Sequence, residues 1–165
     1  MFRGTSVPRG FGLKWRAMAH TCINALYHCV FSTKDRRKII TPEIRPQLWA
    51  YLGGIAREIK THALLVGGTD NHVHLLLQLP AVMSIAKAMQ AIKGGSSIWV
   101  NENRLPDFAW QSGYGAFTIG ASQKNVTLAY IANQANHHRK ITFEEAFLGF
   151  LRKNGMEYDP RYVWG

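Results

Sequence analysis

The chain has 165 residues, 47% of them hydrophobic and 18% charged, which is typical of one globular domain with its own core. It has no apolar stretch long enough for a membrane helix and no apolar segment of a secretory signal, so we expect a cytoplasmic protein without membrane attachment. The net charge is +10, and residues 18–165 keep +6 of it, an excess that favours a polyanionic partner such as nucleic acid.

Residues 1–17 contain Arg3, Arg9, Lys14 and Arg16 and no acid, and we expect them to form a flexible basic arm before a single domain over residues 18–165. Alternating apolar residues predict strands, and apolar residues three or four apart predict helices. The expected strands are 22–32, 63–67, 72–79 and one within 108–119, and the expected helices are 41–59, one from 85 that is weakened at 94–95, 122–139 and 143–153.

This order is β-α-β-β-α-β followed by helices, which predicts an α+β fold with a four-stranded antiparallel sheet, ferredoxin-like or RRM-like. Two helices can cover one face of such a sheet, which leaves the other face free for function. The topology is compatible with nucleic-acid binding but is shared by many other proteins. Cys22 and Cys29 fall at odd spacing within the first strand, so they should point to opposite faces and form no mutual disulfide.

Two histidines stand on the non-core face of the third strand. Val73, Leu75, Leu77 and Leu79 alternate with His72 and His74, so the imidazoles project from one face about 6.7 Å apart at the backbone. Rings at that separation can converge on one metal ion. Two polar side chains on a solvated sheet face are the alternative interpretation.

The helix predicted over residues 122–139 carries a tyrosine. At about 100° per residue, Leu128, Ile131, Ala132 and Ala135 form a stripe that we expect to pack, and Tyr130, Gln134 and His137 lie opposite it. Tyr130 and Gln134 are four residues apart and share a face. Gln134 could be a third metal ligand, and a nearby cation could favour the phenolate of Tyr130 as a nucleophile. A surface tyrosine without a chemical role is the alternative.

Together these segments resemble a known family. The sequence Asn71-His72-Val73-His74-Leu75 resembles the His-hydrophobic-His motif of HUH endonucleases. The segment from Val126 through Tyr130 and Gln134 to His138 resembles the tyrosine helix of the single-tyrosine HUH transposases of small bacterial insertion sequences, the IS200-like family. The REP-associated tyrosine transposases are relatives of this family. Further matches are the segments 110–117 and 142–162, and the similarity begins near Met18. Ala135-Asn136 stand where acidic residues are frequent in the family.

The resemblance implies a DNA transposase that cleaves and rejoins single-stranded DNA. Tyr130 would attack the scissile phosphate, form a 5′-phosphotyrosine and free a 3′-hydroxyl. His72, His74 and Gln134 would hold a divalent ion, magnesium or manganese. The family acts as homodimers with two joined sheets and recognises hairpins near the ends of the element. The expected location is the bacterial cytoplasm, on the nucleoid when DNA is bound.

Other residues have weaker predictions. The candidate phosphate contacts are Lys34, Arg36, Arg37, Lys38, Lys93, Arg139 and Lys140. His137 could support Tyr130 from the same helix face, and His138 is expected to be mainly structural. Two alternative functions remain open: a domesticated relative that processes host repeat hairpins, and a non-catalytic nucleic-acid-binding module.

Overall fold

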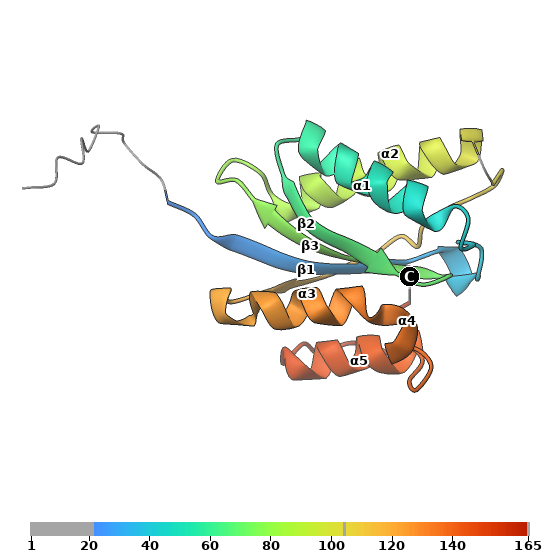
Figure 1. Cartoon of the computed structure of the whole chain (residues 1–165). Coiled ribbons are helices and arrows are strands. Elements are labelled where there is room, and N and C mark those ends of the chain that lie inside the picture. The colour runs from blue at the N-terminus through green and yellow to red at the C-terminus, as the bar shows by residue number, and fades with distance from the viewer. Residues whose placement is uncertain (1–21, 104, 165) are drawn as a thin grey trace, which may run out of the picture.

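The computed structural model describes residues 22–103 and 105–164 (Figure 1). The predicted basic arm over residues 1–17, and residues 18–21 where the family resemblance begins, lie outside the described residues. Within the described part of the chain, no helix combines the length and the apolar character that crossing a membrane requires.

The sheet has four antiparallel strands in the order β2-β3-β1-β4. Their bounds are β1 Ala25–Ser32, β2 His62–Gly68, β3 His72–Leu79 and β4 Gly115–Thr118. With a helix between β1 and β2 and another between β3 and β4, this is the predicted β-α-β-β-α-β order, and the predicted fold is confirmed. The first strand begins three residues later than expected, so Cys22 precedes it and is exposed, whereas Cys29 is buried.

Two helices, α1 (Arg45–Glu58) and α2 (Ile85–Asn103), cover one face of the sheet (Figure 1). The main core lies between these layers, where Leu75 and Leu77 of β3 pack with Leu48 of α1 and Met89 of α2. The predicted core face of the third strand is therefore confirmed. The first helix begins at Arg45, with Pro46 in its first turn, and not at residues 41–42 as the Thr-Pro pair suggested.

The other face of the sheet is covered too, by α3 (Lys124–Ala132), α4 (Gln134–His137) and α5 (Phe143–Lys153) (Figure 1). The face that was expected to serve function is therefore occupied by the tyrosine segment and by α5. Phe143, Phe147 and Leu151, four residues apart on α5, form an apolar stripe that packs with Val30 and Phe117 as a second core. A capping box between Thr142 and Glu145 fixes the start of this helix.

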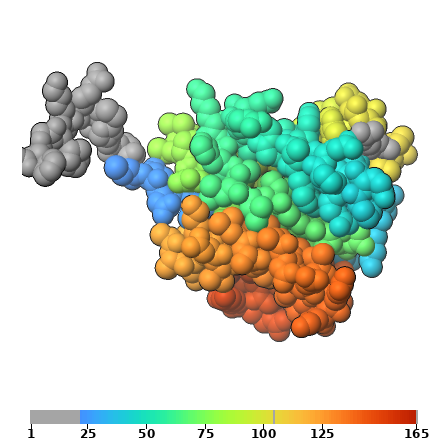
Figure 2. Space-filling view, viewed as in Figure 1, coloured from blue at the N-terminus to red at the C-terminus, as the bar shows by residue number. Residues whose placement is uncertain are grey.

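The predicted helix over residues 122–139 is divided. Short 3-10 turns occur at η1 (Lys34–Arg36) and η2 (Ala121–Gln123), and η2 leads into α3. The α-helical geometry breaks at Asn133 (φ −100°, ψ 20°), and α4 follows as a separate turn. In Figure 2 the orange surface of this segment lies directly against the green surface of the preceding elements, and α3 contacts both β2 and β3.

Candidate active site

His72 lies on β3 beneath α4, with only 1% of its surface exposed. Its Nδ1 is 2.8 Å from Oδ1 of Asn71 and 3.0 Å from Oγ1 of Thr69. The Asn71 amide nitrogen donates to the carbonyl of Arg36, so its oxygen faces the imidazole. Because that oxygen only accepts hydrogen bonds, the proton of His72 belongs on Nδ1, and Nε2 carries a free lone pair.

His74, two residues further along β3, is also 1% exposed. Its Nδ1 is 2.8 Å from Nε2 of His28 on β1, and the two rings stack with centroids 5.0 Å apart and planes at 26°. The remaining nitrogen, Nε2 of His74, is buried and has no hydrogen-bond partner in the described structure. A proton on Nδ1, donated to His28, leaves this atom as a bare acceptor, which is the state that a metal ligand needs.

Gln134 brings a carbonyl oxygen to the same place. Its amide nitrogen donates to the backbone carbonyl of Tyr130, which turns Oε1 toward the histidines. This oxygen lies 3.3 Å from Nε2 of His72 and 3.1 Å from Nε2 of His138. His138 donates from Nδ1 to the carbonyl of Ile141 at 2.9 Å, so its Nε2 is an acceptor as well.

Three acceptors therefore converge with no proton among them: Nε2 of His72, Nε2 of His138 and Oε1 of Gln134. Such an arrangement is repulsive unless a cation lies between the lone pairs. Two ligands about 2.1 Å from one ion, at angles of about 90–109°, lie about 3.0–3.4 Å apart, close to the spacing seen here. The ligand atoms of His72, His74 and His138 also lie within 4.8 Å of one another. The residues fit a divalent metal ion.

The electrostatics agree with this interpretation. Burial lowers the pKa of His72 to about 3 and that of His28 to about 4, and it lowers the pKa of His74 well below its usual value. Burial also lowers the pKa of His138. All these imidazoles are thus neutral at pH 7, and neutral imidazole is the form that binds metals.

Tyr130 lies half-buried on α3, over the histidines. Its ring makes edge contacts with His74 at 5.6 Å, with His28 at 5.9 Å and with His137 at 5.0 Å between centroids. Burial raises the pKa of its hydroxyl, and a hydrogen bond with Gln134 partly offsets this shift. The phenol is therefore protonated at pH 7 without a cation nearby, and a bound metal would favour the phenolate.

The packing face of this segment differs from the predicted one. Thr127, Ile131 and Gln134 are buried, whereas Ala132 and Ala135 are exposed. The prediction assumed that an apolar stripe faces the sheet, but the part of the sheet beneath this segment carries His72, which contacts Gln134. Gly67 of β2 allows the close approach, because a β-carbon there would lie 2.6 Å from the carbonyl oxygen of Ile131.

Two functional candidates were missed by the sequence analysis. His138 joins His72 and His74, whereas His137 contacts the Tyr130 ring. The spacing of four residues between Gln134 and His138 was the available signal. His28 lies on the first predicted strand, and nothing in the sequence paired it with His74.

A charged cleft of about 670 Å³ opens beside the cluster. His72 and His138 line it, together with the basic side chains of Arg36, Lys38 and Arg45 and the acidic ones of Asp35, Asp70 and Glu144. Arg36 pairs with Glu144 at 2.8 Å, and the Nε atom of Arg45 is buried without a hydrogen-bond partner in the described structure. Arg45 was not among the predicted phosphate contacts.

The other predicted phosphate contacts have different surroundings. Lys34 and Arg37 are exposed on the loop that also carries Arg36, and Arg139 and Lys140 are exposed after α4. Lys93 is half-buried on α2, and its ammonium donates to the carbonyls of residues 111, 112 and 113. These bonds hold that loop in place, and a contact of Lys93 with phosphate stays a prediction.

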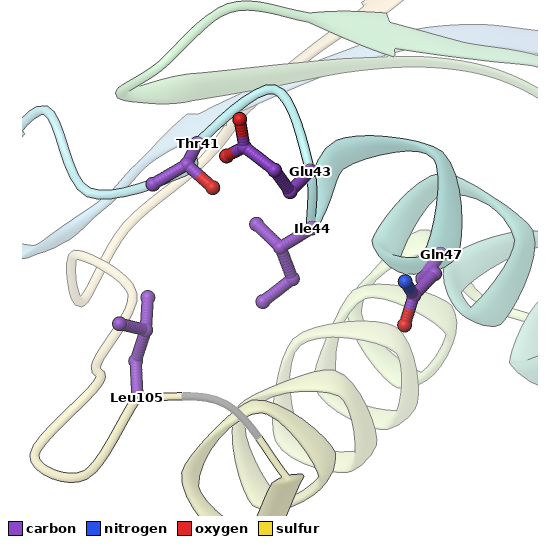
Figure 3. Close-up of a pocket in the computed structure, with 5 residues that line it drawn as sticks. All are labelled: Thr41, Glu43, Ile44, Gln47 and Leu105. Atoms are coloured by element: carbon purple, nitrogen blue, oxygen red, sulfur yellow. The ribbon is translucent and has the colours of Figure 1, made fainter.

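A smaller cavity of about 250 Å³ lies near the N-terminal end of α1. Figure 3 shows Leu105 facing Ile44 across it, below Thr41 and Glu43. Among the described residues that line it, none is a histidine or tyrosine. The candidate active site is therefore the histidine cluster beneath Tyr130.

Known transposases are similar to this chain in sequence and in fold. The transposases for the insertion sequence element IS200 of Salmonella typhimurium (strain LT2) and of Salmonella typhi are each 30% identical to this chain over 127 residues, covering 72% of this chain and 82% of each relative. The fold matches a solved structure from Deinococcus radiodurans R1 that is described as a transposase (TM-score 0.57, 22% identity, 78% of this chain and 98% of that one).

The fold also matches a REP-associated tyrosine transposase solved with a REP hairpin, with a TM-score of 0.57, 14% identity and coverage of 90% of this chain and 95% of that one. The family model for IS200-like transposases matches residues 21–134, which include β1, both β3 histidines, Tyr130 and Gln134. This chain belongs to the IS200-like transposase family.

Proposed function

We propose that this transposase cleaves and rejoins single-stranded DNA, with Tyr130 as the nucleophile and His72, His74 and Gln134 as ligands of a divalent metal ion. The observation that carries the proposal is the convergence of unprotonated acceptors directly beneath Tyr130. His138 adds a further imidazole donor to the predicted ligand set. A set rich in imidazole favours manganese over magnesium, which prefers oxygen ligands.

The reaction is a transesterification. The Tyr130 hydroxyl oxygen forms a bond to phosphorus, the bond from phosphorus to the 3′-oxygen breaks, and the phenolic proton is lost as the leaving oxygen gains one. A bound divalent ion would polarise the phosphate and stabilise its developing charge. One phosphodiester is exchanged for another, so no energy source is needed. Attack by another 3′-hydroxyl on the phosphotyrosine reverses the step and joins strands.

The residues of this chain prepare that step. Gln134 contacts the Tyr130 hydroxyl and the two imidazoles, so it links the nucleophile to the proposed metal site. Asn71 and His28 hold His72 and His74 in the tautomer that leaves Nε2 free. Arg36, Lys38 and Arg45 in the adjoining cleft would contact the DNA backbone.

The test is formation of a covalent adduct. The full chain is incubated with Mn²⁺ and single-stranded oligonucleotides from the ends of the DNA segment that carries the gene, and a denaturing gel shows any protein–DNA adduct as a shifted band. We expect the band with wild type and with Tyr51→Phe, a control on the outer helix layer, and no band with Tyr130→Phe or with chelator. A band from Tyr130→Phe would exclude this nucleophile. DNA binding that survives chelation, without any adduct from wild type, would indicate a binding module instead.

We also propose that the active form is a homodimer and that the DNA ends contain hairpins. One chain already places Tyr130 over its own histidines, so dimerisation is not needed to complete the cluster. Two exposed sheet edges, β2 and β4, are available for joining two sheets. Light scattering of the purified chain with and without hairpin DNA measures its mass, and a monomer under both conditions would contradict the dimer.

A further inference from the structure

An apolar cleft of about 440 Å³ also reaches the nucleophile, and it shares no lining residue with the charged cleft. Tyr130 and His28 form part of its wall. Phe117 and Phe150 lie beside them, stacked with centroids 5.4 Å apart, and the Phe150 ring contacts Tyr130 at 5.5 Å. The inner part of this cleft is therefore aromatic.

The mouth of the same cleft is polar. Ser122, Gln123, Lys153 and Asn154 line it and are exposed. Among the described lining residues none is acidic, in contrast to the charged cleft with its three carboxylates. An aromatic interior with amide, hydroxyl and ammonium groups at the mouth matches a nucleotide, whose base has flat apolar faces and polar edges and whose phosphates are anionic.

We propose that this cleft binds the base of one of the two nucleosides joined to the phosphate that Tyr130 attacks. The proposal rests on the proposed function, since Tyr130 as nucleophile fixes where that phosphate lies. A nucleoside bonded to that phosphate is necessarily beside the Tyr130 ring, which is a wall of the cleft. The charged cleft, with its basic side chains, suits the sugar-phosphate chain better than an unpaired base.

Phe150 is the residue that would contribute most to stacking. It is half-buried, whereas Phe117 is only 3% exposed and is occupied by the second core. Stacking of one base on an aromatic side chain changes affinity by about tenfold or more when the aromatic group is removed. Because every base has an aromatic face, this contact predicts a requirement for a base and only a weak preference among bases.

The test is a double-mutant cycle between Phe150 and the DNA. Wild type and Phe150→Leu are titrated with the intact oligonucleotide and with oligonucleotides abasic on the 5′ or the 3′ side of the scissile phosphate, and the half-saturating concentration for adduct formation is measured. We expect one abasic substitution to raise that concentration about tenfold with wild type. Phe150→Leu should raise it similarly with intact DNA, and the combination should add little more.

The proposal would be overturned if Phe150→Leu and the abasic substitution each raised the half-saturating concentration and their effects multiplied when combined. That result would mean that Phe150 acts only by supporting α5. Abasic substitutions without effect on either side would overturn it as well, and this arm leaves the protein unaltered. Tyr51→Leu, which removes an exposed aromatic ring from α1, should change none of the values. Fluorescence anisotropy on the same oligonucleotides repeats the cycle for binding alone, so a failure of adduct formation remains distinct from a failure of base binding.

Discussion

The hydrogen bond between His28 and His74 makes the metal affinity of the site depend on a residue that touches no ion. When His74 carries its proton on Nδ1 and donates it to His28, its Nε2 is left free for a metal. Replacing His28 by Phe keeps a ring of similar size and removes the acceptor. His28→Phe then offers no acceptor beside Nδ1 of His74, so the tautomer with the proton on Nε2, which cannot bind a metal, is no longer disfavoured.

Loss of the group that orients a metal-binding histidine and raises its basicity weakens metal affinity about 10- to 100-fold. His28→Gln supplies a carbonyl oxygen that can accept the proton, so it should keep most of the affinity. The full chain is titrated with Mn²⁺ by calorimetry, with thermal unfolding in chelator as a check of the fold. Equal affinity of the Phe and Gln variants, both folded, would refute the tautomer argument.

Three further predictions concern the same site. His138→Ala should weaken Mn²⁺ binding about tenfold, whereas His137→Ala, which removes a ring that contacts Tyr130 and His138, should change it little. Equal losses in the two titrations would contradict the assignment of His138. Gly67→Ala should lower the free energy of unfolding by about 1–3 kcal/mol and reduce adduct formation, because a β-carbon there meets the Ile131 backbone. Gly54→Ala, with open space around it, is the control. Unchanged denaturant midpoints for both variants would be inconsistent with this packing. In chelator, the free energy of unfolding should fall as pH drops below 6.5, because the pKa values of His28 and His72 in the folded protein, about 4 and about 3, lie below the unfolded value and the unfolded chain binds more protons. Each histidine contributes a loss of about 2 kcal/mol at pH 5. Denaturant midpoints that stay constant from pH 7 to pH 5 would exclude this effect.

The strand pattern could be predicted because its physical cause is local. Alternation along β3 sets which side chains face the α1–α2 layer, and both the bounds of that strand and its core face were predicted correctly. The α5 bounds were equally predictable, since Thr142 and Glu145 cap a clear apolar stripe. Local patterns therefore determine the elements and which residues face the main core.

The packing of the tyrosine segment could not be predicted in this way. An apolar stripe predicts the packing face of one continuous helix on an apolar surface. This segment instead breaks at Asn133 and lies on histidines. Gln134 is consequently buried where a polar side chain was expected to face away from the sheet. The glycine that allows the approach, Gly67, is on another strand and gives no signal in the tyrosine segment itself.

The hydrogen bonds that best support a metal ion are made by residues outside the sequence motifs or by the backbone. A pair of strand histidines allows either a solvated face or a metal site, because each ring can carry its proton on either nitrogen. Asn71, His28 and the carbonyl of Ile141 each bind one Nδ1. Protons on these Nδ1 atoms leave the three Nε2 atoms free, and those of His72 and His138 face Oε1 of Gln134. Burial prevents the imidazoles from relieving this repulsion by protonation at pH 7. A divalent cation would satisfy all of these acceptors together, and under the proposed mechanism it would lie beside the phosphate that Tyr130 attacks.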